Sequence, residues 1–124
     1  MEWETQSTSG RANPNPNDDP DTLTAVSNMG LLLLGQGKLS LAESLLRRAL
    51  EGSERNLGRD HPDTLQSVNN MGGLLYQQGK FSLAEPYFRR AAEGRERTLG
   101  RDHPDTLKSA INLRVLLKAM EREK

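Results

Sequence analysis

Residues 61–102 read HPDTLQSVNNMGGLLYQQGKFSLAEPYFRRAAEGRERTLGRD, and this stretch decides the fold because the chain contains it twice. Residues 19–60 match it without a gap at 28 of 42 positions. A third copy begins at His103 and extends over the first half of the unit. A fixed period of this length is typical of solenoids, in which each unit buries its apolar face against its neighbours. We therefore expect an extended surface rather than a closed active-site pocket.

The repeat divides the chain into four segments. Residues 1–18 are rich in Pro, Asn, Ser and Asp and contain little that can be buried, which predicts a disordered tail. Residues 19–60 are repeat 1, and residues 61–102 are repeat 2. Residues 103–124 form a half repeat, which we interpret as a capping helix of the kind that solenoids need for solubility. The alternative is that this segment belongs to a longer array.

Each repeat is expected to form two helices. In repeat 2, Leu65, Val68, Met71 and Leu75 fall on one face at helical spacing, and the turn residue Gly79 follows them. The same pattern in every copy predicts an all-α fold without strands. The five expected helices cover about residues 21–36, 40–56, 63–78, 82–98 and 105–121.

The helix ends and the helix contacts carry further signals. Asp60 is expected to cap the first helix of repeat 2, and Ser82 with Glu85 should form a capping box at the start of the second. Gly72 is expected where the paired helix presses close. Gly94 lies inside the second helix and should weaken it by about 1 kcal/mol relative to Ala. The apolar face of the half repeat is expected to contain Leu107, Leu113 and Leu117.

Composition and charge exclude several classes of protein. The formal net charge is zero and the pI is near 6.7, so no basic surplus is available to displace counterions from a nucleic acid. The absence of cysteine excludes disulfides and thiol chemistry and fits a reducing compartment. The longest apolar run, Leu31 to Leu34, is far too short to span a membrane, and the first ten residues lack the features of a signal peptide. We expect a cytoplasmic protein with no nucleic-acid or membrane partner.

Three motifs suggest chemistry at first sight, but each has a structural explanation. His61 and His103 stand beside aspartates, yet helix capping accounts for this pattern and stacked repeats hold equivalent positions apart, so we expect no metal or acid–base site. The segments 35–40 and 77–82 lack the residues that a phosphate-binding loop needs around Gly-Lys. Arginines at 47–48, 89–90 and 95–101 are interleaved with glutamates, which predicts a solvated outer face with ion pairs. We therefore expect no cofactor and no catalytic residue.

The pattern of small and large residues in repeat 2 resembles the tetratricopeptide repeat signature, on Met71-Gly72, Leu75, Gly79, Ala84, Phe88 and Ala91. The 42-residue period and the line LGRDHPDTLQSVNN resemble the longer variant found in kinesin light chains. Similar repeats also occur in the sensor regions of large NTPase signalling proteins. The resemblance covers about residues 19–117. It implies a right-handed superhelix of antiparallel helix pairs, an α-solenoid in which the first helix of each pair lines a concave groove.

The groove positions that the resemblance implies are mostly polar. They are Thr24, Ser27, Asn28, Leu31 and Leu34 in repeat 1, Gln66, Asn69, Asn70, Gly73, Tyr76 and Gln77 in repeat 2, and Lys108, Ile111 and Asn112 in the half repeat. Asparagine recurs at 28, 70 and 112, which predicts a ladder of amides able to pair with the backbone of an extended peptide. The alternative is that these amides bond to the neighbouring helix.

The N-terminal tail holds the sole tryptophan of the chain. The sequence Met1-Glu2-Trp3-Glu4 resembles the acidic tryptophan peptides that bind kinesin light chain grooves, which makes Trp3 a candidate groove-binding residue. The alternative is that this short N-terminal sequence has no such role.

These features favour a non-catalytic adaptor or scaffold that binds a peptide or a partner protein in the groove. Two alternatives stand beside this interpretation. The chain could be a self-assembly module that forms a homo-oligomer through unpaired outer helices, because fewer than three repeats rarely suffice for stability. It could also be a fragment of a larger repeat-bearing signalling or kinesin-light-chain-like protein.

Overall fold

The computed structural model describes residues 19–123, and these form helices with no strand among them. The helices are α2 (Pro20–Gly35), α3 (Leu39–Leu57), α4 (Pro62–Gln77), α5 (Phe81–Leu99) and α6 (Pro104–Arg122). Every helix begins and ends within one residue of the expected position. The prediction of an all-α fold is therefore confirmed, and the periodicity placed each helix correctly.

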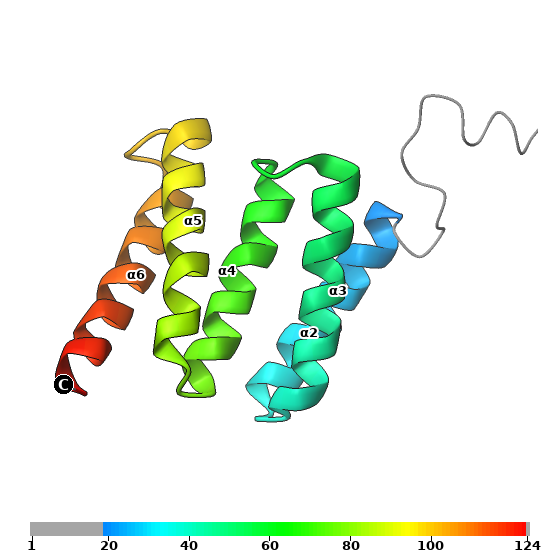
Figure 1. Ribbon diagram of the computed structural model, residues 1–124. Coiled ribbons are helices and arrows are strands. Elements are labelled where there is room, and N and C mark those ends of the chain that lie inside the picture. The colour runs from blue at the N-terminus through cyan, green and yellow to red at the C-terminus, as the bar shows by residue number, and fades with distance from the viewer. Residues whose placement is uncertain (1–18, 124) are drawn as a thin grey trace, which may run out of the picture.

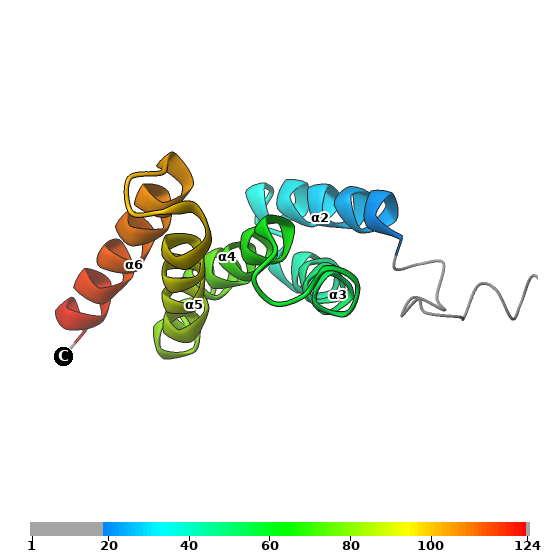
Figure 2. The ribbon, with the colours of Figure 1, turned by 90° about the horizontal axis from the view of Figure 1, so that it is seen from above.

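Successive helices alternate in direction; α3, α4, α5 and α6 follow one another in a row across the view of Figure 1, and α2 lies partly behind α3. Each helix packs mainly against the helices before and after it in the chain, while α2 touches α4 only slightly. The view from above places α2 and α6 at opposite ends of the row (Figure 2). α2 and α4 therefore have few direct contacts, and both pack against α3.

The core is thin and runs through the middle of the row. Leu46, Val68, Met71 and Leu74 belong to one buried cluster, which joins repeat 1 to α4. A second cluster joins repeat 2 to the half repeat and contains Leu75, Ala84, Phe88 and Leu116. The residues expected on the inner faces of α3, α4 and α5 are all buried, which confirms the helical pattern.

The two helices of each repeat approach closely at glycine. A β-carbon added to Gly72 would lie 2.8 Å from the Phe88 ring, and one added to Gly30 would lie 2.7 Å from the Leu46 side chain. The expected packing role of Gly72 is therefore confirmed. Gly94 has the same role, because a β-carbon there would lie 2.7 Å from Leu65. The close contact gives a packing reason for glycine at position 94, and the expected cost of about 1 kcal/mol in helix propensity stays a prediction.

The short turns inside the repeats depend on glycine in the left-handed region. Gly79 has φ of 77°. Its N–H donates to the Tyr76 carbonyl at 3.0 Å, and the next N–H, that of Lys80, donates to the Leu75 carbonyl at 2.9 Å. This pair of bonds is the Schellman arrangement, which satisfies the last carbonyls of α4 and turns the chain into α5. Repeat 1 has the same turn at Gly37.

Two predictions about helix starts are wrong. Residue 61, not Asp60, caps α4: the His61 Nδ1 accepts from the Asp63 N–H at 3.1 Å. The helix α5 begins at Phe81 after Lys80 and has no side-chain cap bond, so Ser82 and Glu85 do not form a capping box. The Schellman turn carries the chain directly into the helix, which leaves Ser82 inside the first turn. The same correction applies to repeat 1, where α3 follows Lys38.

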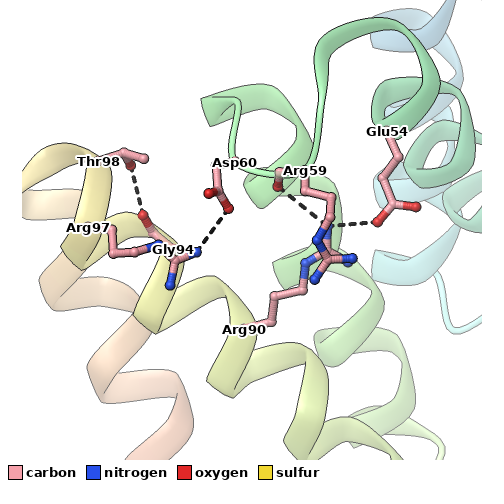
Figure 3. A network of polar contacts seen from close by, with 7 residues as sticks. All are labelled: Glu54, Arg59, Asp60, Arg90, Gly94, Arg97 and Thr98. Atoms are coloured by element: carbon pink, nitrogen blue, oxygen red, sulfur yellow. Dashed lines mark hydrogen bonds and ion pairs between the residues drawn. The ribbon is translucent and has the colours of Figure 1, made fainter.

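Ion pairs hold the loop after repeat 1 against α5 (Figure 3). The Arg90 guanidinium lies 2.7 Å from the Glu54 carboxylate and 3.4 Å from the Arg59 carbonyl. Arg97 pairs with Asp60 at 3.0 Å. These contacts join residues that are distant in sequence. The ion pairs expected within helices are found elsewhere, between Arg47 and Glu43 at 2.9 Å and between Arg89 and Glu85 at 2.6 Å.

The half repeat differs from the expected apolar face. Leu113 packs against the second cluster, but Leu107 and Leu117 are 50% and 40% exposed. Their counterparts in repeat 2, Leu65 and Leu75, lie against α5. No second helix follows α6 within residues 19–123. The buried face of α6 is the one that points back to repeat 2, with Thr106, Ser109, Leu116 and Ala119.

Two adjacent glycines allow a direct test of the helix contact. Replacement of Gly72 by Leu should lower the free energy of unfolding by about 1–3 kcal/mol, because the new side chain overlaps Phe88. Replacement of Gly73 by Ala should instead raise it, by up to about 1 kcal/mol, because a β-carbon at Gly73 meets nothing within 4 Å. Urea denaturation monitored by circular dichroism measures both. A Gly72→Leu variant as stable as the parent would contradict the packing argument.

Candidate functional site

The face formed by α2, α4 and α6 contains two adjoining hollows. The first hollow has a volume of about 190 Å³ and lies between α2, α4 and the last turns of α3. It is lined by Pro20, Leu23, Thr24, Ser27, Asn28, Leu31, Ser53, Asn56, Leu57, Asp63, Gln66, Ser67 and Asn70. The second, which we call the central hollow, has a volume of about 320 Å³. It is lined by Leu31, Leu34, Asn69, Asn70, Gly73, Tyr76, Gln77, Phe88, Asn112 and Val115.

The two hollows differ in their chemistry. Asp63 is the one charged residue in the lining of the first hollow, and the other polar groups there are hydroxyls and amides. The lining of the central hollow has no charged residue and combines four amide side chains with apolar and aromatic ones. Hollows of this kind can bind an extended chain through hydrogen bonds and apolar contacts. Leu31 and Asn70 belong to both linings, so the two hollows adjoin on this face.

A chain of hydrogen bonds crosses the row of helices behind this face. The Asn70 amide donates to Ser27 Oγ at 3.4 Å, and its oxygen accepts from Gln66 Nε2 at 2.8 Å. The oxygen of Gln66 accepts from Arg95 at 2.8 Å, and Arg95 also donates to Ser109 Oγ at 2.9 Å. Four helices, α2, α4, α5 and α6, are thereby connected through side chains.

Arg95 is the central residue of this chain and is itself only 4% exposed. Besides Gln66 and Ser109, its guanidinium donates to the Asp105 carbonyl at 3.3 Å. Burial lowers the pKa of Arg95, while the nearby Asp105 carboxylate opposes that shift. The expectation that Arg95 belongs to the solvated outer face is therefore wrong. The helical position of residue 95 turns its side chain inward, between α4 and α6.

Most of the residues expected in the groove lie together. The hollows bring together twelve of them, namely Thr24, Ser27, Asn28, Leu31, Leu34, Gln66, Asn69, Asn70, Gly73, Tyr76, Gln77 and Asn112. Lys108 and Ile111 are exposed on α6 and line neither hollow. Trp3 lies outside the described residues. The first helices of the three copies thus supply most of one continuous surface.

The amides of this surface do not form the expected ladder. Asn70 bonds to Ser27 on α2, and Asn112 donates to the Asn69 oxygen on α4 at 3.2 Å. Only Asn28 is exposed among the three recurring asparagines. Asn70 and Asn112 therefore follow the alternative interpretation, in which the amides join neighbouring helices.

Sequence reasoning missed the deep residues of the first hollow. Ser53 and Ser67 are buried and Asp63 stands at the rim, on the first turn of α4. One signal for this hollow was present in the sequence, because Ser53 stands at the repeat position that Arg95 occupies in repeat 2. A short and a long side chain at equivalent inward positions must leave different amounts of space.

A metal centre has no basis in this part of the chain. Residues 19–123 contain no group of three or more His, Cys, Asp or Glu side chains placed to hold a metal ion. Within the same residues, none of the helices combines the length and apolar character that a membrane span requires.

Comparisons with known proteins agree with this architecture. The family model for the tetratricopeptide repeat matches residues 21–97 and 67–124. The crystal structure of BtubC (BKLC) from P. vanneervenii superposes with a TM-score of 0.76, at 25% sequence identity, over 88% of this chain. The present chain corresponds to 43% of the BtubC chain. No curated protein matches the sequence.

Arg95 allows a test of the hydrogen-bond chain. Replacement of Arg95 by Ala should lower the free energy of unfolding by about 1–3 kcal/mol, because the acceptors on α4 and α6 lose their donor. The matched control is Arg101→Ala, whose side chain is 85% exposed; its loss should cost less than about 0.5 kcal/mol. Urea denaturation measures the difference. Equal effects of the two substitutions would exclude a connecting role for Arg95.

Proposed function

Because this chain belongs to the tetratricopeptide repeat family and has a repeat of the kinesin-light-chain-like type, we propose that it binds an extended peptide segment of a partner protein along α2, α4 and α6. Tetratricopeptide repeats generally mediate protein–protein interaction, and the fold is typically a non-catalytic module. The proposed role is that of an adaptor or scaffold.

The position of two adjoining hollows on one face, with Leu31 and Asn70 in both linings, is the observation that carries this proposal. Ser27 lines the first hollow and Leu34 the central one. These residues are seven positions apart on α2, which corresponds to about 10 Å along the helix axis. A peptide in the polyproline II conformation covers that distance with three residues, at about 3.1 Å each, and its side chains at positions i and i+3 point to the same side. A short linear segment can therefore place side chains in both hollows at once.

The chemistry of the linings favours a peptide over other partners. Exposed amides such as Asn28 and Gln77 can donate to and accept from a peptide backbone. Leu34, Tyr76 and Phe88 offer apolar contact for a side chain of the partner. The net charge of zero argues against a nucleic acid, whose phosphates require a surplus of cationic side chains.

The exposed apolar residues of the end helices favour a second candidate function, self-association. Leu107, Val115 and Leu117 are 50%, 46% and 40% exposed on α6, and Met29 and Leu32 are 49% and 55% exposed on α2. A second copy of the chain could cover these side chains. Light scattering at two concentrations tests this candidate, since a homo-oligomer would show a mass above 13.8 kDa that falls on dilution.

The peptide-binding proposal can be tested by selection of peptides from a random displayed library against the full chain. The affinity of the selected peptides is then measured by fluorescence polarisation for the parent and for two variants. Gly73→Tyr places a ring in the central hollow and should weaken binding at least about tenfold. Gly35→Tyr is the matched control, because Gly35 is also a helical glycine with open space around it and lines neither hollow.

The control should bind like the parent. If every selected peptide binds the Gly73→Tyr variant as tightly as the parent, the proposed site is wrong.

A further inference from the structure

The two repeats differ at one inward position that decides whether space remains beside the α2–α4–α6 face. Residue 95 in repeat 2 is arginine, and its counterpart in repeat 1, 42 positions earlier, is Ser53. Both side chains are 4% exposed. Each stands on the second helix of its repeat, and each is directed toward the junction with the next unit. The junctions therefore provide an internal comparison between a long and a short residue.

At the junction of α4 and α6, the guanidinium of Arg95 fills the space. It donates to Gln66 Oε1 at 2.8 Å, to Ser109 Oγ at 2.9 Å and to the Asp105 carbonyl at 3.3 Å. All three acceptors are uncharged, and the Asp105 carboxylate supplies a negative charge nearby. This junction shows that the repeat can hold a buried guanidinium.

At the junction of α2 and α4, the corresponding space is the first hollow. The counterparts of Gln66, Asp105 and Ser109 are Thr24, Asp63 and Ser67, and all three line that hollow together with Ser53. A hydroxyl replaces the amide at position 24, while Asp and Ser are retained. Oxygen acceptors are therefore present at this junction as well. No arginine within residues 19–123 fills it, because Ser53 stands at the position equivalent to Arg95.

We propose that the first hollow is a receptor for an arginine side chain of the partner peptide, an inference that rests on the proposed peptide-binding function. Guanidinium carries five N–H donors in a planar fork, which suits a lining of hydroxyl, carbonyl and carboxylate oxygens. Asp63 gives the lining its single charge, and that charge is negative. Leu23 and Leu57 also line the hollow and can contact the methylene stem of the arginine.

The central hollow determines what accompanies the arginine. Its lining has no charged residue and includes Leu34, Tyr76 and Val115, which favours an apolar side chain. The separation of about 10 Å derived from helix geometry corresponds to one turn, three residues, of a peptide in the polyproline II conformation, in which side chains three positions apart point to the same side. The peptide recognised by this face should therefore carry an arginine and an apolar residue three positions apart.

The test uses the full chain and two fluorescein-labelled hexapeptides, Gly-Arg-Ala-Ala-Leu-Gly and the reversed order Gly-Leu-Ala-Ala-Arg-Gly. Each is compared with the same peptide containing citrulline in place of arginine, which has nearly the same shape without the charge. For whichever of the two peptides binds, replacement of its arginine by citrulline should weaken the affinity at least about tenfold. Citrulline has no positive charge, so the charge-assisted hydrogen bonds to carboxylate and carbonyl oxygens are lost. Lysine should fall between the two, because it has three donors on a compact, strongly hydrated head.

Substitution of Ser53 locates the binding site. Ser53→Arg would place the chain's own guanidinium in the first hollow, as Arg95 does in the next junction, and should remove the preference for arginine over citrulline. Ser44→Arg is the matched control, because it adds the same charge at an exposed position of the same helix. Ser44→Arg should keep the preference of the parent. Circular dichroism confirms that each variant is folded.

Asp63→Asn provides a second variant if Ser53→Arg does not fold. It removes the one charge from the lining at an exposed position, and it should weaken the arginine peptide by about threefold or more while leaving the citrulline peptide unchanged. Equal affinity for arginine and citrulline, no binding of either arginine peptide up to millimolar concentration, or an unchanged preference in both variants would overturn the inference. If the two peptides bind equally and Gly73→Tyr weakens both, the arginine receptor is wrong while the peptide-binding function stands.

Discussion

The close contact between the two helices of each repeat is the constraint on which the rest of the structure depends. At Gly30 and Gly72 a side chain of the partner helix, Leu46 or Phe88, lies where a β-carbon would otherwise stand. This contact fixes each pair as one body, and the second helix of the pair then separates the first helices of successive units. Because α2 and α4 scarcely touch, the space between them becomes the first hollow. Helix packing and the binding face therefore have one common cause.

The fold could be predicted from the sequence almost completely, because the helical periodicity recurs in every copy and the turn glycine recurs in both full repeats. The helix caps could not, since Ser82 with Glu85 satisfies the sequence rule while the Schellman turn at Gly79 starts α5 before that rule can apply. The exposure of Leu107 and Leu117 on α6 also escaped prediction. Their periodicity matches that of repeat 2, but periodicity alone does not say whether a packing partner follows.

Most of the residues on the surface of the candidate site could be predicted, but several of its buried residues and its hydrogen bonds could not. The family resemblance identified most of the positions on α2 and α4 that line the hollows, because these follow from helix register. It did not identify the hydrogen-bonding partners: Asn70 and Asn112 each join two helices rather than facing a ligand. The burial of Arg95 was also missed, because the charged residues nearest to it in sequence, Glu93, Glu96 and Arg97, are exposed. The position of a residue on its helix determines the direction of its side chain. The sizes of the surrounding side chains determine whether that side chain contacts another helix or an open hollow.

The difference between Ser53 and Arg95 also has a meaning for the history of such chains. Two repeats that arise by duplication begin with identical residues at their junctions. Each inward position therefore makes the same contacts at first. A short residue in place of a long one leaves space at one junction, while the other junction keeps an internal hydrogen-bond network. Recognition can then diversify one unit at a time, and a solenoid can acquire a new preference without altering its backbone.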